Sequence, residues 1–152
     1  MSDREEIVSR VTAALEGAPA PVAIRNARKV DARGEQSGYW VVSNASGAIV
    51  ASGVGDEAFE QYCGTVGIDP ADRNAVVDAE GRILTPGYVD IHSHGAWEKS
   101  FDDGPDGIDV ARAGHAVHGT TRQVLSLITN PVDVICGNIR NVRAKMEAGR
   151  PD

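Results

Sequence analysis

Hydrophobic residues near the start of the chain recur at the spacing of one helix face. Ser2 and Glu5, at the head of this stretch, have the three-residue spacing of an N-terminal capping box. The apolar positions of the face are Ile7, Val8, Val11 and Leu15. The pattern predicts an amphipathic helix over about residues 3–16, and the small residues and prolines that follow predict a linker.

Between residues 22 and 84 the apolar residues fall in short runs with β-branched and aromatic side chains, which are typical of strands. The predicted strands lie near residues 22–27, 39–42, 48–50, 76–78 and 82–84. The last two flank Ala79-Glu80-Gly81 and are expected to form a hairpin. A helix is predicted over residues 56–63, so this segment is expected to form a small antiparallel sheet layer.

After Pro86-Gly87 the pattern alternates between strand and helix, which is typical of a parallel sheet covered by helices. The predicted order is a strand over 88–94, a helix over 108–118, a strand over 121–127 and a helix over 132–147. The apolar positions on one face of the last helix are Val132, Ile135, Cys136, Ile139, Val142 and Met146. This face is expected to pack against the strands, with Ile139 among the residues whose truncation is costly.

Composition and charge narrow the classes of partner. The 152 residues hold 15 basic and 22 acidic side chains, a net charge of −7. This balance argues against nucleic acid and anionic membranes as partners, because both bind clustered Lys and Arg. No apolar stretch reaches the roughly 20 residues of a spanning helix, and the first residues lack a secretory apolar region. A cytoplasmic protein is expected, with Cys63 and Cys136 as free, mostly buried thiols.

The segment from Leu84 to Gly95 carries the candidate chemistry. Side chains alternate along a strand, so Asp90, His92 and His94 are expected to point to one side. Two imidazoles at this spacing can converge on one metal ion, for which neutral imidazole nitrogen is a good ligand. Asp90 lies deeper on the same face and is expected to orient the site. From the spacing alone, partly buried structural histidines remain an equal alternative.

This segment resembles the start of the amidohydrolase superfamily, in which a Pro-Gly approach leads to Asp-x-His-x-His at the end of the first barrel strand. Within the superfamily it is most similar to the N-acetylglucosamine-6-phosphate deacetylase family. Val77–Ile83 resembles the last sandwich hairpin of that family, and Gly119-Thr120-Thr121 with Leu125–Thr129 resembles its Gly-Thr-Thr turn and second strand. His115 lies in the predicted helix that leads to the Gly-Thr-Thr turn. The resemblance covers about residues 22–152, and residues 1–17 have no clear counterpart.

The resemblance implies an α/β fold: the N-terminal part of a (β/α)₈ TIM-barrel metallohydrolase preceded by part of a small β-sandwich. The implied domains are a helical extension (1–18), the partial sandwich (19–85) and two β/α units of the barrel (86–152). His92 and His94 fall on the metal positions of the first strand, and Asp90 on an acid of the approach strand with a structural role. The implied cofactor is a divalent metal ion, zinc or iron.

The activity that the resemblance implies is metal-dependent hydrolysis of N-acetylglucosamine 6-phosphate to glucosamine 6-phosphate and acetate, a reaction of amino sugar metabolism. The implied partners are a phosphorylated amino-sugar substrate and, in full-length members, further copies of the chain. Two alternatives stay open. One is another amidohydrolase, such as a cyclic-amide hydrolase or an aminohydrolase, and the other is a non-catalytic fragment.

The chain also departs from the family pattern. A barrel of this type needs about 250 residues, whereas two strand–helix units follow Pro86 here. The Glu ligand of the third strand, the later His ligands and the catalytic Asp have no counterpart in these residues. We therefore expect a fragment or a truncated relative that is inactive alone, and no catalytic residue is assigned.

Other polar residues after the motif have simpler interpretations. His115 and His118 lie near a helix C-terminus, where a cation interacts favourably with the helix dipole. The acidic residues Glu98, Asp102, Asp103, Asp106 and Asp109 lack the order of an EF-hand loop. They are expected to form an acidic loop at the barrel mouth, in which Trp97 is a candidate substrate contact. Trp40 is expected to pack in the sheet.

Overall fold

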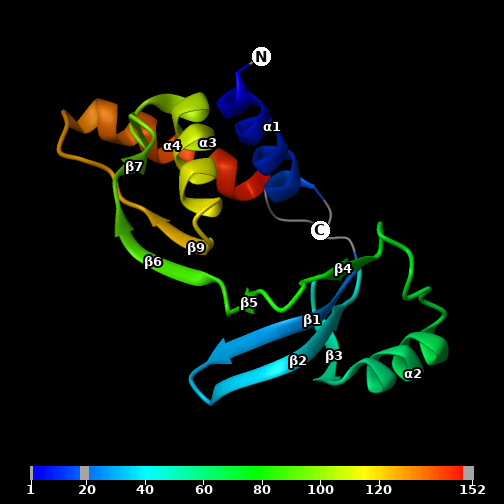
Figure 1. The fold of residues 1–152 in the computed structure, drawn as a ribbon. Coiled ribbons are helices and arrows are strands. Elements are labelled where there is room, and N and C mark those ends of the chain that lie inside the picture. The colour runs from blue at the N-terminus through cyan, green and yellow to red at the C-terminus, as the bar shows by residue number, and fades with distance from the viewer. Residues whose placement is uncertain (1, 18–20, 149–152) are drawn as a thin grey trace. The chain divides into compact units, whose positions relative to one another are not determined.

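The computed structural model describes residues 2–17 and 21–148, and the chain divides into two compact units (Figure 1). Unit 1 joins Met1–Gly17 to Gly87–Asp152, and unit 2 is Ala18–Pro86. The N-terminal helix thus groups with the residues that carry the histidine motif. Each unit is described by itself.

Unit 2 is built on a five-stranded sheet. Three strands, β1 (Val22–Asp31), β2 (Gly34–Ser43) and β3 (Ile49–Val54), pair in antiparallel order, and α2 (Asp56–Val66) follows them. The strands near 22–27, 39–42 and 48–50 and the helix over 56–63 are therefore confirmed, each longer than its sequence pattern indicates.

The predicted hairpin in unit 2 is wrong. The short strands β4 (Val76–Asp78) and β5 (Ile83–Leu84) do not pair with each other; both pair with β1, in parallel. The segment runs alongside β1 instead of folding back, so the sheet is mixed rather than antiparallel.

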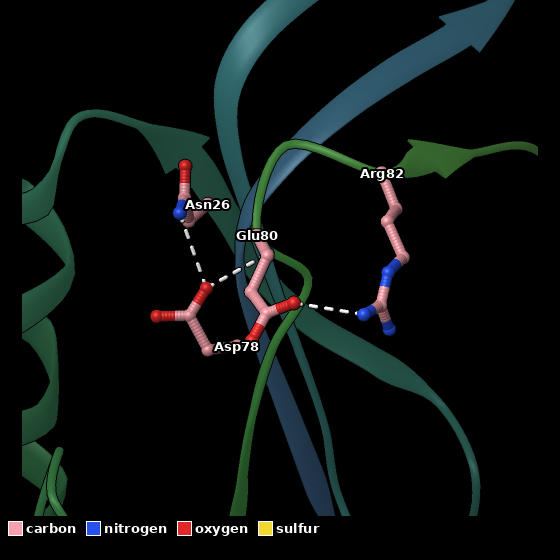
Figure 2. Close-up of polar contacts among 4 residues, drawn as sticks. All are labelled: Asn26, Asp78, Glu80 and Arg82. Carbon is pink, nitrogen blue, oxygen red and sulfur yellow. Dashed lines mark hydrogen bonds and ion pairs between the residues drawn. The ribbon is translucent and has the colours of Figure 1, made fainter.

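A polar cluster at the break between β4 and β5 explains this path (Figure 2). Asp78 Oδ1 accepts hydrogen bonds from Asn26 Nδ2 (3.1 Å) and from the backbone N–H of Glu80 (2.8 Å). Asn26 has φ 53° at an irregularity in β1, and Glu80 has φ 52°. The turn after β4 is therefore tied to the matching distortion of β1, and pairing resumes beyond it at β5.

The core of unit 2 lies between the sheet and α2. It contains Ala23, Trp40, Val42, Phe59, Cys63 and Val76. The Trp40 ring lies 5.8 Å from the ring of Phe59 and 5.5 Å from that of Tyr62, which confirms its packing role. Burial raises the pKa of the Cys63 thiol, as expected for an inert core cysteine.

Unit 1 opens with α1 (Asp3–Glu16), whose capping box is confirmed: Ser2 N–H donates to Glu5 Oε2, and Glu5 N–H donates to Ser2 Oγ. α1 lies against α3 (Gly104–Ala116) of the same unit. The helix predicted over 108–118 thus begins four residues earlier and ends two residues earlier.

The centre of unit 1 is a strand–helix–strand arrangement. β6 (Tyr88–Ser93) and β9 (Thr120–Leu125) pair in parallel, as the sequence predicts, and α4 (Val132–Ala148) follows β9 (Figure 1). Between β6 and α3, β7 (Gly95–Ala96) and β8 (Lys99–Ser100) form a short antiparallel pair. The described residues contain two parallel strands of this sheet, and they do not form a closed barrel.

The predicted buried face of α4 is confirmed only in part: Val142 packs on the core, whereas most of its other apolar residues are exposed. Ile139 is 52% exposed and Val132 is 78% exposed. Cys136 is exposed as well, so the expectation of a buried thiol is confirmed for Cys63 and wrong for Cys136. Asn138, at 8% exposure, points inward instead because its side chain donates to Asp102, and Val142 packs on the core of Phe101, Ile108 and Ala111. A polar contact therefore helps to set the rotation of this helix, and apolar periodicity alone does not reveal it.

Candidate metal centre

The histidine motif lies where two parallel strands end together. β6 ends at Ser93, directly before His94, and the N–H of Ser126, just beyond β9, donates to the carbonyl of Ser93 (3.0 Å). Parallel sheets place ligand sites at the carboxyl ends of their strands. The two histidines therefore occupy the edge at which such sites form.

The structure brings His92 and His94 together. Their ring centroids lie 4.9 Å apart, with the rings nearly perpendicular. Both side chains are exposed. Two imidazoles at this separation are close enough to serve as neighbouring ligands of one ion.

The hydrogen bonding of His94 fixes which ring nitrogen is available. Its Nδ1 lies 3.1 Å from the carbonyl oxygen of Ser126. A carbonyl only accepts, so Nδ1 donates this hydrogen bond, and in the neutral ring Nε2 then keeps its lone pair. Metal-binding histidines typically donate their second ring N–H in this way, which sets the tautomer and the ring orientation.

Asp90 contacts the backbone of the motif and a histidine of α3. Its Oδ1 accepts from the backbone N–H of His92 (3.0 Å), and its Oδ2 lies 3.6 Å from Nδ1 of His115. His115 Nε2 in turn lies 3.2 Å from the carbonyl of Gly95. The contacts of Asp90 and His115 thus span the stretch from His92 to Gly95.

Sequence reasoning missed this contact of His115. The pattern places His115 near a helix C-terminus and points to the helix dipole, whereas the structure turns its ring toward β6. Its position 25 residues after Asp90 carries no local signal. Only the packing of α3 against the strands brings Asp90 and His115 together.

Gly95 determines how the chain leaves the motif. A Cβ at this position would lie 2.0 Å from the carbonyl oxygen of Lys99, a separation that no side chain tolerates. Trp97 and Glu98, with φ of 53° and 63°, form the turn that joins β7 to β8. The chain therefore turns sharply away directly after His94.

The acidic residues after the motif do not gather into one cluster. Glu98 is exposed beside Arg4, Asp109 pairs with Lys145 (2.6 Å), and Asp102 is hydrogen-bonded inside the unit. Trp97, the candidate substrate contact, lies beneath the Arg4 guanidinium, 5.7 Å from the ring centroid, and packs beside Gly114. Its ring stabilises the docking of α1 and α3.

The donor set fits part of a metal site. Imidazole nitrogens suit zinc and iron, and the fixed tautomer of His94 presents one of them. Across residues 2–17 and 21–148, no group of three or more His, Cys, Asp or Glu side chains is arranged to hold a metal ion. His92 and His94 therefore fit two ligand positions, and the described residues offer no third.

In residues 2–17 and 21–148 no helix is both long and apolar enough to cross a membrane.

Comparison with curated proteins gives partial matches, and no protein-family model matches the chain. Imidazolonepropionase of Geobacillus kaustophilus is 31% identical over 98 residues, which is 58% of this chain and 20% of that protein. Dihydroorotase of Clostridium acetobutylicum is 43% identical over 67 residues, which is 44% of this chain and 15% of that protein. The chain thus spans a fifth or less of the length of these two relatives.

Solved structures give broader coverage. N-acetyl-D-glucosamine-6-phosphate deacetylase from Mycobacterium smegmatis matches 84% of this chain with a TM-score of 0.60 and 25% identity, over 33% of its own length. A mutant of that enzyme in complex with N-acetyl-D-glucosamine-6-phosphate matches 88% with a TM-score of 0.54 and 24% identity, over 31% of its length. The predicted resemblance is confirmed: this chain is similar to the N-terminal part of amidohydrolase-superfamily enzymes, the deacetylases among them.

Proposed function

We propose that this chain supplies the first-strand metal ligands of a metal-dependent amidohydrolase that deacetylates N-acetylglucosamine 6-phosphate, giving glucosamine 6-phosphate and acetate. The observation that carries the proposal is the histidine pair at the end of β6. The two rings lie 4.9 Å apart, and His94 donates from Nδ1 to Ser126, so that Nε2 is left to bind an ion.

Each residue of the motif has a separate task in this proposal. His92 and His94 hold the ion, and the Ser126 carbonyl keeps the His94 ring in one tautomer. Asp90 fixes the backbone at His92. A divalent metal held there, zinc or iron, supplies Lewis-acid activation of water and of the substrate carbonyl.

The substrate class rests on the structural neighbours. The deacetylase matches over most of this chain with a TM-score of 0.60, and its mutant is described in complex with N-acetyl-D-glucosamine-6-phosphate. A phosphorylated amino sugar is therefore the first candidate substrate.

A second candidate has its own support. Two of the curated matches bear the names imidazolonepropionase and dihydroorotase, and the dihydroorotase is 43% identical over 67 residues. The same histidine pair would then serve a metal-dependent hydrolase that acts on imidazolonepropionate or dihydroorotate.

Zinc binding tests the metal site directly. Equilibrium dialysis of the chain against zinc is expected to show binding that falls about tenfold or more in His92→Asn and in His94→Asn. His118→Asn, which alters an exposed histidine beyond the end of α3, is the matched control and is expected to bind as the native chain does. Equal binding by all four proteins would refute the metal site.

Substrate titration separates the two candidates. The zinc-loaded chain is titrated with N-acetylglucosamine 6-phosphate, with dihydroorotate and with imidazolonepropionate, while the ring signals of His92 and His94 are followed by NMR. The deacetylase proposal expects these signals to move with the phosphorylated sugar alone. A response to either of the other compounds alone would favour the second candidate.

A further inference from the structure

Asp102 is the most heavily hydrogen-bonded carboxylate in the described part of unit 1. Its Oδ1 accepts from Asn138 Nδ2 (2.8 Å) and from Asn130 Nδ2 (3.4 Å). Its Oδ2 accepts from the backbone N–H of Ile128 (3.1 Å) and from Ser100 Oγ (3.2 Å). One side chain thus joins the end of β8, the segment after β9 and α4.

Two of these segments, the end of β8 and the segment after β9, also contact His94. The backbone N–H of Phe101, the residue before Asp102, donates to the carbonyl of His94 (3.1 Å). The ring of His94 donates to the carbonyl of Ser126, two residues before Ile128. The contact from Ile128 to Asp102 therefore closes a ring of hydrogen bonds that begins and ends at His94.

From this closed path we propose that Asp102 is a positioning residue for His94, which sets the orientation and tautomer of the imidazole by holding Ser126 in place. The inference rests on the proposed metal site for its functional meaning, because a fixed His94 tautomer matters only if Nε2 binds an ion. The side-chain hydrogen bonds of Asp102 go to residues other than His92 and His94, so it acts through the segment from Ser126 to Asn130.

The chemistry of the network requires a carboxylate at position 102. Four donors converge on two oxygens, and a carboxylate accepts on both, whereas an amide accepts on one. Asn138 is 8% exposed, so its amide depends on this partner. In Asp102→Asn the shape is kept, but one of the two oxygens becomes an NH₂ group that faces two donors. At least one of the four donors then loses its acceptor.

The tautomer of His94 is the direct readout. In metal-free native chain in alkaline buffer, where imidazole is neutral, long-range ¹H–¹⁵N spectra are expected to show the proton on Nδ1 of His94. In Asp102→Asn the His94 signals are expected to shift toward a mixture of both tautomers. Asp106→Asn, which alters an exposed carboxylate in the first turn of α3, is the control and is expected to leave them unchanged.

This measurement separates the inference from the proposed function. Zinc affinity in Asp102→Asn is expected to fall about tenfold or more, in the range of changes behind a metal ligand. If zinc does not bind the native chain, the metal site fails, yet the tautomer shift still tests the positioning. A folded Asp102→Asn variant that keeps the native His94 tautomer would overturn the inference, even if its melting temperature falls.

A milder variant covers the case in which Asp102→Asn does not fold. Ser100→Ala removes one of the four donors and leaves the carboxylate in place. It is expected to shift the His94 tautomer in the same direction by a smaller amount. An unchanged His94 ring in folded Ser100→Ala, together with an unfolded Asp102→Asn, would also overturn the inference, because the network would then serve folding alone.

Discussion

Two isoleucines on helices of unit 1 differ sharply in their surroundings. Ile108 on α3 is fully buried against Phe101 and Ala111, whereas Ile139 on α4 is 52% exposed. Truncation of a buried isoleucine removes its transfer free energy and leaves a cavity, and an exposed one loses little.

Ile108→Ala is therefore expected to lower the free energy of unfolding of unit 1 by about 2–5 kcal/mol. Ile139→Ala makes the same chemical change and is expected to cost about 0.5 kcal/mol or less. Urea unfolding followed through the amide signals of α3 measures both. A costly Ile139→Ala would show that the apolar periodicity of α4 describes its packing after all.

The histidine pair is the part of the candidate site that the sequence predicts well. Alternation along a strand is local, so the proximity of His92 and His94 follows from two residues of separation. The contacts of Asp90 with His115 and of Asp102 with Ile128 span 25 and 26 residues. Nothing in the spacing of those residues indicates these contacts, because they depend on the packing of α3 against the strands and on the pairing of β6 with β9.

Lys145 links three helices of unit 1. Its ammonium lies 2.6 Å from Asp109 of α3 and 3.2 Å from Glu16 at the end of α1. Burial alone would lower the pKa of Lys145, but its hydrogen bonds to Asp109 and Glu16 and the negative charge of both carboxylates together outweigh that effect, and the pKa lies above the ordinary lysine value. The ammonium form is thus favoured by folding.

The sign of this shift predicts loss of stability at alkaline pH. A lysine with a raised folded pKa contributes fully to stability below its unfolded pKa of ~10.4, and this contribution is lost as the pH rises through the folded pKa. The melting temperature of the native chain is expected to exceed that of Lys145→Met at about pH 9, and the difference is expected to shrink toward pH ~12. A difference that is constant over this window would contradict the prediction. Lys99→Met, which alters an exposed lysine of β8, controls for general alkaline effects.

The elements themselves were predictable to different degrees. α1 follows from its capping box and apolar spacing, both of which are local. β4 and β5 do not, because their partner is β1 and the polar cluster around Asp78 diverts the turn between them. A short apolar run indicates a strand, but it carries no information about the strand with which it pairs.

For the molecule as a whole, the resemblance predicts more than the described residues contain. It implies a barrel, whereas these residues form one parallel strand pair with α1, α3 and α4 in unit 1 and a mixed sheet with α2 in unit 2. The likeness to the deacetylase extends over 84% of this chain and 33% of that enzyme. The histidine motif is thus recognisable although most of the corresponding enzyme has no counterpart in these residues.

A polypeptide of these 152 residues alone is therefore expected to release no acetate from N-acetylglucosamine 6-phosphate. Catalytic zinc sites use three protein ligands and an open position for water, and the described residues bring two histidines together without a third ligand. Two imidazoles hold an ion loosely and leave the water on it weakly activated. The test is to incubate the purified chain with zinc or iron and the substrate, and to measure acetate against buffer with the same metal. Turnover above that background which disappears in His92→Asn would contradict the prediction, and would mean that copies of the chain complete the site between them.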